Sequence, residues 1–198
     1  MPSVTRFLCL ASLGINALVL MDLVHPNNLI FIREPVTQRY EIWRIFTSLF
    51  LGSGGFSYAL ELVILYLIAE QLESGSFSRK SADFAWQLII IGTAIIIVCL
   101  PLNTQILTHP FLVALSCLCA ALASSRARIS LLDMFRVPVK YTPYIVVAFD
   151  ILKCGPAAAV HSIVGMVVGC LCWWSMWAGR KPILRSLSRA PAWLRSLV

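Results

Sequence analysis

The chain has 198 residues, of which 59% are apolar and 13% charged, and its formal net charge is +7. The apolar share exceeds that of soluble domains of this length, so composition excludes a water-soluble globule and predicts an integral membrane protein. The basic residues are scattered between apolar segments and form no basic, aromatic-rich stretch, which argues against nucleic acid as a partner.

Six apolar segments follow one another, and we predict that each is a membrane-spanning helix. They are Phe7–Met21, Phe56–Leu72, Phe84–Leu100, Phe111–Ala123, Tyr144–Leu152 and Ala157–Ala178. The first has the length of a signal-peptide core, but no small-residue cleavage site follows it. The sequence therefore predicts an all-α polytopic membrane protein with one transmembrane domain, residues 1–178, and a short basic cytosolic tail, residues 179–198.

The first connection is long, from about Asp22 to Gly55, and contains its own apolar stretch, Ile45–Leu51. Trp43 and Arg44 stand directly before that stretch. An aromatic and basic pair in this setting is typical of a membrane interface, with Trp43 at headgroup depth and Arg44 extended toward lipid phosphate.

The basic residues are distributed unevenly between the two sides of the predicted bundle. One side has four: Arg33, Arg39, Arg44 and Lys153. The other has twelve: Arg6, Arg79, Lys80, Arg126, Arg128, Arg136, Lys140, Arg180, Lys181, Arg185, Arg189 and Arg195. The positive-inside rule then places both termini in the cytosol and the long first loop in the lumen or outside the cell. Glu70 and Glu73 lie near the cytosolic Arg79 and Lys80, and we interpret them as ordinary boundary charges.

Two acidic residues fall inside predicted spans, Glu61 in the second and Asp150 in the fifth. A lipid-facing carboxylate costs roughly 2.5–3.5 kcal/mol on insertion scales, so both should face a wet cavity or a partner. For Glu61 the cavity is favoured, since no basic residue is close to it in the same helix. For Asp150 a cavity and a simple pair with Lys153 are equally good interpretations.

The first and fifth segments are shorter than the roughly 30 Å hydrocarbon layer requires, which predicts local thinning of the bilayer or cover by protein.

Gly165 and Gly169 lie one turn apart in the sixth segment and allow close helix packing. The packing is either against the fourth segment or against another subunit, and internal packing against the fourth segment is favoured. The seven cysteines form no CxxC motif and are interpreted as small core residues, so no metal or cofactor is expected.

Several segments resemble one family in the same order and at similar separations. They are "PSVTR" at 2–6, "YEIWRIFTSLF" at 40–50, "LESGSFSRKSADF" at 72–84 and "GMVVG" at 165–169. These are similar to segments of the Derlins, rhomboid-like proteins without protease activity. The resemblance implies a rhomboid-like bundle of six transmembrane helices with a long luminal first loop. It matches Trp43 and Arg44 to the family's Trp-Arg motif, and Gly165 and Gly169 to its GxxxG.

Active rhomboids use a Ser-His dyad, which raises the alternative of an intramembrane serine protease. The fourth segment contains no glycine, so Ser116 lacks the Gly-x-Ser turn that exposes the nucleophile. Registering the sixth segment on Gly165 and Gly169 places Ser162 at the catalytic histidine position, with His161 one residue, or about 100°, away. We therefore expect no catalytic residues and no enzymatic activity.

The resemblance implies a component of endoplasmic-reticulum-associated degradation, in the endoplasmic reticulum membrane, that helps misfolded luminal proteins return to the cytosol. The implied partners are a membrane RING ubiquitin ligase, its luminal adaptor, a Herp-like scaffold, misfolded polypeptides and membrane lipids. The tail lacks the Gly-rich, Phe-containing motif with which some Derlins bind the AAA ATPase segregase. That contact is therefore expected to be indirect, as in the short fungal type.

Two other functions fit the same features. A pseudoenzyme receptor could deliver membrane or luminal clients without forming a passage, through the same glycines and luminal loop. A small-molecule transporter fits the topology, but the sequence has no inverted repeats with matched broken helices.

Overall fold

The computed structural model describes residues 2–30, 43–78, 80–102, 106–123, 128–131, 135–178, 190, 191 and 194. Within them the long helices are α1 (Ser3–Leu20), α4 (Gly55–Gln71), α5 (Ser81–Cys99), α6 (Thr108–Leu122), α7 (Thr142–Cys154) and α8 (Pro156–Trp173). They follow the six predicted segments in order, so the prediction of an all-α polytopic bundle is confirmed.

Shorter elements connect or extend these helices. Helical turns are η1 (Pro26–Asn28), η3 (Leu100–Leu102) and η4 (Val139–Tyr141), and π-helical turns η2 (Leu72–Ser76) and η5 (Trp174–Ala178) continue α4 and α8. Helix α3 (Trp43–Phe50) lies within the long first connection. An antiparallel hairpin, β1 (Arg128–Leu131) with β2 (Phe135–Pro138), precedes α7.

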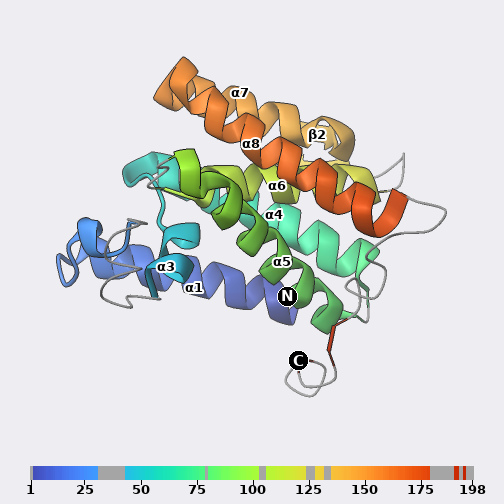
Figure 1. Ribbon diagram of the computed structural model, residues 1–198, viewed down its shortest axis with the longest axis horizontal. Coiled ribbons are helices and arrows are strands. Elements are labelled where there is room, and N and C mark those ends of the chain that lie inside the picture. The colour runs from blue at the N-terminus through green and yellow to red at the C-terminus, as the bar shows by residue number, and fades with distance from the viewer. Residues whose placement is uncertain are drawn as a thin grey trace.

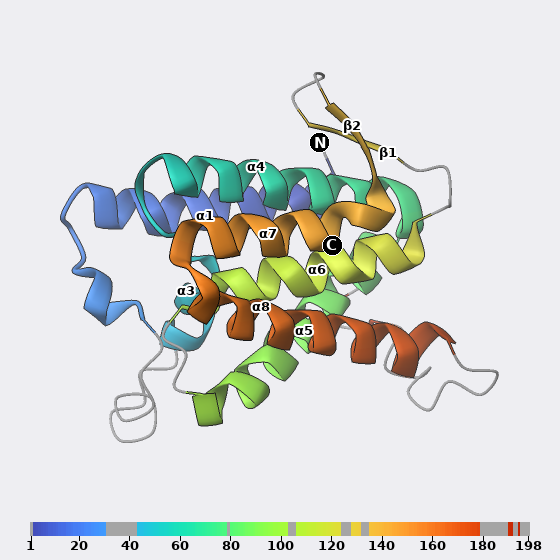
Figure 2. The same cartoon turned by 90° about the horizontal axis from the view of Figure 1, so that it is seen from above.

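Helix α6 occupies the middle of the bundle. Figure 1 shows α7 and α8 along one edge, α1 along the opposite edge and α6 between them, and Figure 2 shows α6 running between α7 and α8. It contacts α4, α5, α7 and α8, and every residue from Phe111 to Cys119 is buried. A helix that is apolar on all sides is expected at such a central position.

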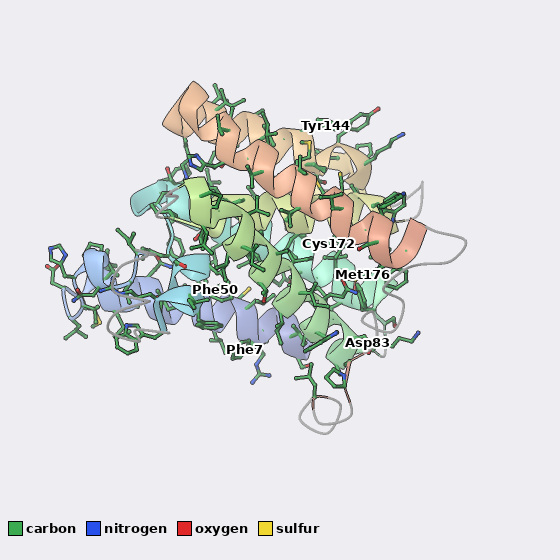
Figure 3. All side chains as sticks on the ribbon, viewed as in Figure 1. Phe7, Phe50, Asp83, Tyr144, Cys172 and Met176 are labelled. Atoms are coloured by element: carbon green, nitrogen blue, oxygen red, sulfur yellow. The ribbon has the colours of Figure 1, made fainter. Side chains whose placement is uncertain are left out.

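The outer surface of the bundle is apolar, as a lipid-facing surface requires. Figure 3 shows Phe7 on α1 and Tyr144 on α7 pointing outward, and these side chains are 59% and 64% exposed. Phe50, Cys172 and Met176 are instead buried. The chain thus presents hydrophobic residues both inside and outside, which is the pattern of a membrane bundle and not of a soluble core.

The helices differ in length. Among the described residues, four helical segments are long and apolar enough to cross a membrane: Ser3–Leu20, Gly55–Ser76, Ser81–Cys99 and Ala159–Trp177. With 15 and 13 residues, α6 and α7 measure only about 22 and 20 Å. The expected short first span is wrong, because α1 has 18 residues and begins at Ser3. The expected short fifth span is confirmed as α7.

Glu73 explains the early start of α1. Its carboxylate is buried and accepts hydrogen bonds from the amides of Val4 and Thr5, at 3.1 and 2.7 Å, and from the Thr5 hydroxyl at 2.8 Å. These amides have no acceptor within the helix, and the carboxylate also suits the positive end of the helix dipole. The interpretation of Glu73 as a boundary charge is therefore wrong.

The turn η2 also places Phe77 in the core. Its ring lies 5.5 Å from that of Phe84 and 5.9 Å from that of Trp177, measured between centroids. Such tilted and edge-on aromatic pairs add to the stabilisation from burial. The segment "LESGSFSRKSADF" therefore links the end of α4 to the start of α5, and it contacts the start of α1 and the turn η5 that follows α8.

Candidate functional site

At the end of the bundle where α4, α6 and α8 begin and α7 ends (Figure 1), a group of polar side chains lies between the helices. We call it the polar cluster. Its members are Ser53, Glu61, His109, Asp150, Lys153 and Ser162. It includes both predicted intramembrane acids, and it joins four long helices and the loop before α4.

Glu61 on α4 forms one half of the cluster. The Ser53 hydroxyl and amide donate to its two oxygens, at 2.6 and 3.3 Å. The Lys153 ammonium on α7 pairs with the same carboxylate and donates to the Ser53 hydroxyl at 2.7 Å. Glu61 is 3% exposed. A buried carboxylate is tolerated when it is paired and its lone pairs are occupied, and both conditions hold here.

Asp150 on α7 forms the other half. Its Oδ1 lies 3.0 Å from Nδ1 of His109, and its Oδ2 accepts the Ser162 hydroxyl at 2.7 Å. Asp150 is 2% exposed. The alternative that Asp150 pairs with Lys153 is wrong, since that ammonium pairs with Glu61. The reason is geometric: residues three apart on a helix are neighbours, but α7 presents Lys153 toward α4 and Asp150 toward α6 and α8.

His109 connects the two halves. It stands in the first turn of α6, and its Nε2 lies 4.0 Å from Oε1 of Glu61 while Nδ1 contacts Asp150. The cluster thus contains two carboxylates that share one imidazole. Charged groups at such a position inside a membrane protein are expensive, and they typically mark a functional path or site. That Glu61 and Asp150 line a hydrated cavity stays a prediction.

Gly165 and Gly169 bring α8 against α6 beside the cluster. A Cβ on Gly165 would collide with the carbonyl oxygen and Cα of Pro110, and one on Gly169 would lie 2.7 Å from the carbonyl oxygen of Ala114. Both glycines therefore allow backbone contact between the two helices. Because Pro110 follows His109, this packing places Ser162 on α8 close to the start of α6.

The Trp-Arg pair opens α3. Arg44 is 7% exposed, and its Nη1 donates to the Ile30 carbonyl at 3.2 Å, whereas Trp43 is 56% exposed. Thr47 donates to the carbonyls of Leu29 and Trp43, both at 3.1 Å. Arg44 therefore contacts the polypeptide on one side of α3, and Trp43 extends outward.

The end of α3 is joined to the start of α6. The amide of Leu107 and the hydroxyl of Thr108 donate to the Ser48 carbonyl at 3.2 and 3.3 Å, and Thr108 also donates to the Leu51 carbonyl at 2.6 Å. Thr108 directly precedes His109. The first loop and the polar cluster are thus neighbours in the fold, which their sequence separation does not show.

Ser116, which was considered as the nucleophile, and Ser162, which occupies the position of the catalytic histidine, have other partners. Ser116 is buried within α6 and donates to the Val113 carbonyl at 2.7 Å. Ser162 donates to Asp150. A nucleophilic serine instead requires an imidazole that accepts its proton. His161, beside Ser162, is half-buried.

Several cysteines lie in the core, as expected. Those buried are Cys9, Cys99, Cys117, Cys119 and Cys172, whereas Cys170 is exposed. Among the described residues no group of three His, Cys, Asp or Glu side chains is arranged to hold a metal ion.

Sequence reasoning missed two members of the cluster, Ser53 and His109, and it considered Lys153 only as a loop charge and as a partner of Asp150. A usable signal exists for His109 and Lys153: His109 opens an apolar helix, and Lys153 ends one, so both are polar residues at span boundaries. The partner of each is 41 or 92 residues away, and no local pattern identifies it.

The fold and the buried charges define a polytopic helical membrane protein. The profile of the Der1-like family matches residues 1–178, so the chain belongs to that family. It is 27% identical to human Derlin-1 over 172 residues, 85% of this chain and 67% of the relative. It is 26% identical to Derlin-1.2 of Zea mays over 186 residues, 91% and 74% of the two chains. It is 26% identical to Derlin-1 of Arabidopsis thaliana over 183 residues, which are 90% of this chain and 67% of the relative.

Proposed function

We propose that this protein is a non-catalytic component of endoplasmic-reticulum-associated degradation that helps misfolded luminal proteins return to the cytosol. Membership of the Der1-like family supports a role in this process. The observation that carries the proposal is the polar cluster, because it brings four ionisable side chains together inside an apolar bundle.

A chain that crosses intact hydrocarbon exposes unsatisfied amides, each costing several kcal/mol. Polar groups within the bundle lower that cost. The charges of Glu61 and Lys153 favour local hydration on the luminal side of the proposed passage. In this proposal the cluster forms the luminal part of a hydrophilic cavity.

Short helices favour a thinned membrane. At 13 and 15 residues, α7 and α6 are about 20 and 22 Å long, against a hydrocarbon core of roughly 30 Å. A bilayer beside such helices compresses or the flanking residues reach toward the interface. Because α6 is enclosed by other helices, the thinning effect is assigned to α7, whose Tyr144, Ile151 and Leu152 are exposed.

The absence of catalysis in this proposal is supported by the hydrogen bonds of Ser116, the candidate nucleophile, and of Ser162, which stands at the catalytic histidine position. Ser116 donates to a backbone carbonyl and Ser162 to a carboxylate. A fluorophosphonate probe tests the alternative of a serine protease. We expect no labelling of the purified protein, and labelling at either serine would refute the proposal.

The proposed partners are the membrane RING ubiquitin ligase of this pathway, its luminal adaptor and a Herp-like scaffold, with contact to the AAA ATPase segregase indirect. The proposed location is the endoplasmic reticulum membrane with both termini cytosolic. Most of the basic tail lies outside the described residues, but Ala190 donates its amide to Asp83 of α5 at 2.7 Å. Figure 3 shows Asp83 at the end of the bundle that this orientation places in the cytosol.

The direct test is the turnover of a misfolded luminal glycoprotein in cells that lack this protein. We expect the glycoprotein to persist in the lumen and to regain normal turnover when the native chain is restored. Unchanged turnover in the deletion cells would contradict the proposal.

A receptor without a passage is the second candidate, and the close α6–α8 packing at Gly165 and Gly169 is compatible with it because it needs only a stable bundle. Cysteines introduced at positions 53 and 61 separate the two functions. Modification of both by a membrane-impermeant, water-soluble thiol reagent supports a hydrated cavity, and protection of position 61 favours the receptor.

A further inference from the structure

The acidic and basic members of the polar cluster differ in accessibility. The side chains of Glu61 and Asp150 are 4% and 3% exposed, whereas those of His109 and Lys153 are 16% and 13% exposed. Ser53 is exposed. A ligand that reaches the cluster from outside therefore meets the side chains of His109 and Lys153 before the carboxylates, and we call this exposed side of the cluster its opening.

Lys153 offers a hydrogen-bond donor at this opening. An ammonium group has three N–H bonds. Two are directed to the Ser53 hydroxyl and the Glu61 carboxylate. The third has no oxygen or nitrogen acceptor in the part of the chain that the structure describes, and the ammonium lies 5.3 Å from the centroid of the Phe149 ring. Lys153 can therefore donate to an oxygen atom of a ligand while its pair with Glu61 stays intact.

His109 offers an acceptor beside it. The Asp150 carboxylate accepts hydrogen bonds, so the ring nitrogen 3.0 Å from it, Nδ1, is assigned the hydrogen. In the neutral ring Nε2 then carries a lone pair. Nε2 lies 4.0 Å from Glu61, beyond hydrogen-bonding distance. The opening thus presents one donor and one acceptor.

A peptide group has the complementary pair, a carbonyl acceptor and an N–H donor. We propose that the opening of the polar cluster binds the backbone of an extended client polypeptide, with Lys153 donating to a carbonyl and His109 Nε2 accepting an amide hydrogen. The inference deepens the proposed function by naming what the cluster binds. Recognition of backbone is independent of side-chain sequence, which suits a protein that handles many unfolded clients.

Charge favours the neutral backbone over acidic side chains as the ligand. With His109 neutral, the cluster holds the two carboxylates of Glu61 and Asp150 and the single ammonium of Lys153. Like charges in a medium of low dielectric constant repel strongly, so a client carboxylate would be repelled. A neutral peptide group avoids that repulsion, so segments without acidic side chains should bind best.

The test uses the full-length protein in lipid nanodiscs and a fluorescent twelve-residue peptide with blocked ends and no charged side chain. Its matched partner carries one N-methyl group at the central residue, which removes a single amide hydrogen. We expect N-methylation to weaken binding to the native protein by about two- to tenfold, the loss of one hydrogen bond. Fluorescence anisotropy gives both dissociation constants.

His109→Asn is the informative variant, because the shorter amide can still donate to Asp150 but lacks an atom at the Nε2 position. It should bind the unmethylated peptide about two- to tenfold more weakly, and N-methylation should then have no further effect. A purely structural role for His109 predicts an equal methylation effect in both proteins. That outcome, or a preference for acidic peptides, would overturn the proposal.

Two further variants keep the test decisive if His109→Asn does not fold. Glu61→Leu with Lys153→Met removes the donor and introduces no new one, without leaving the charge of either partner unpaired, and it should weaken binding of the unmethylated peptide. Lys153→Arg retains a donor and should bind it normally. Equal affinity of all three proteins would contradict the proposal. Client turnover in deletion cells tests the proposed function separately, because peptide binding is measured on purified protein.

Discussion

Glu73 shows how one carboxylate determines where a helix begins. It stands in η2 and accepts hydrogen bonds from the amides of Val4 and Thr5, so it joins the end of α4 to the start of α1. Charged hydrogen bonds of this kind contribute more than neutral ones, and the loss of the acceptor leaves buried donors without a partner. The contact is therefore structural and independent of the polar cluster.

Glu73→Ala should lower the free energy of unfolding by about 1–3 kcal/mol, since two buried amides lose their acceptor. Unfolding of the purified protein in detergent, followed by circular dichroism, measures the change. Glu70→Ala is the matched control one helical turn earlier, and it should change stability by less than about 0.5 kcal/mol, as is usual for partly exposed positions. Equal effects of the two substitutions would contradict the assignment.

The Glu61 and Lys153 pair makes a different prediction at the same scale. Removal of one partner leaves a buried charge, so Lys153→Met should destabilise the protein by about 3–5 kcal/mol. Glu61→Gln with Lys153→Met should recover most of that loss because no unpaired charge remains. A double-mutant cycle of unfolding free energies measures the coupling. Additive effects would show that the two side chains do not interact in the folded protein.

At the scale of elements, the closest helix contact is that of α8 with α6. Gly165→Ala and Gly169→Ala should each destabilise the protein by about 1–3 kcal/mol, because a Cβ would collide with backbone atoms of α6. Gly14→Ala is the control: nothing lies within 4 Å of its added Cβ, and alanine favours the helix. It should be neutral or stabilising in the same detergent unfolding assay. If Gly14→Ala were as harmful as the other two, close packing could not be the cause.

The Trp-Arg pair belongs to the same scale, because it holds α3 in the first loop. Arg44 donates to the Ile30 carbonyl, and α3 in turn bonds to the start of α6 beside His109. Arg44→Ala should therefore slow export of a misfolded luminal glycoprotein more than it lowers the abundance of the protein. Client half-life and steady-state protein level are measured in the same cells. If client export slows only in proportion to the fall in protein level, the pair has only an anchoring role.

The sequence predicts elements better than their ends. Six apolar segments identify six helices, because each apolar run is a local property that one window of sequence reveals. The start of α1 and the ion pair of Lys153 depend on partners 69 and 92 residues away. Such contacts appear only after the helices are packed. For the same reason the sequence suggests the nearby Lys153 as a partner of Asp150, whereas the actual partners of Asp150 lie on α6 and α8.

At the scale of the whole molecule, the polar cluster lies at one end of the bundle. The first loop, the start of α6 and the end of α7 meet there, while Glu73 and the aromatic contacts of Phe77 stabilise the other end. One end is therefore held together by charges and loop contacts, and the opposite end by capping and aromatic packing. This asymmetry is the basis for placing client entry at the polar cluster.

The central claim is that the polar cluster serves client passage and not stability alone. Glu61→Leu with Lys153→Met replaces the ion pair by apolar side chains of similar size, a change that often preserves or raises stability. The decisive measurement is the turnover of a misfolded luminal glycoprotein in cells whose only copy carries this pair, at native protein abundance. The account predicts turnover as slow as in deletion cells. Turnover at the native rate would contradict it.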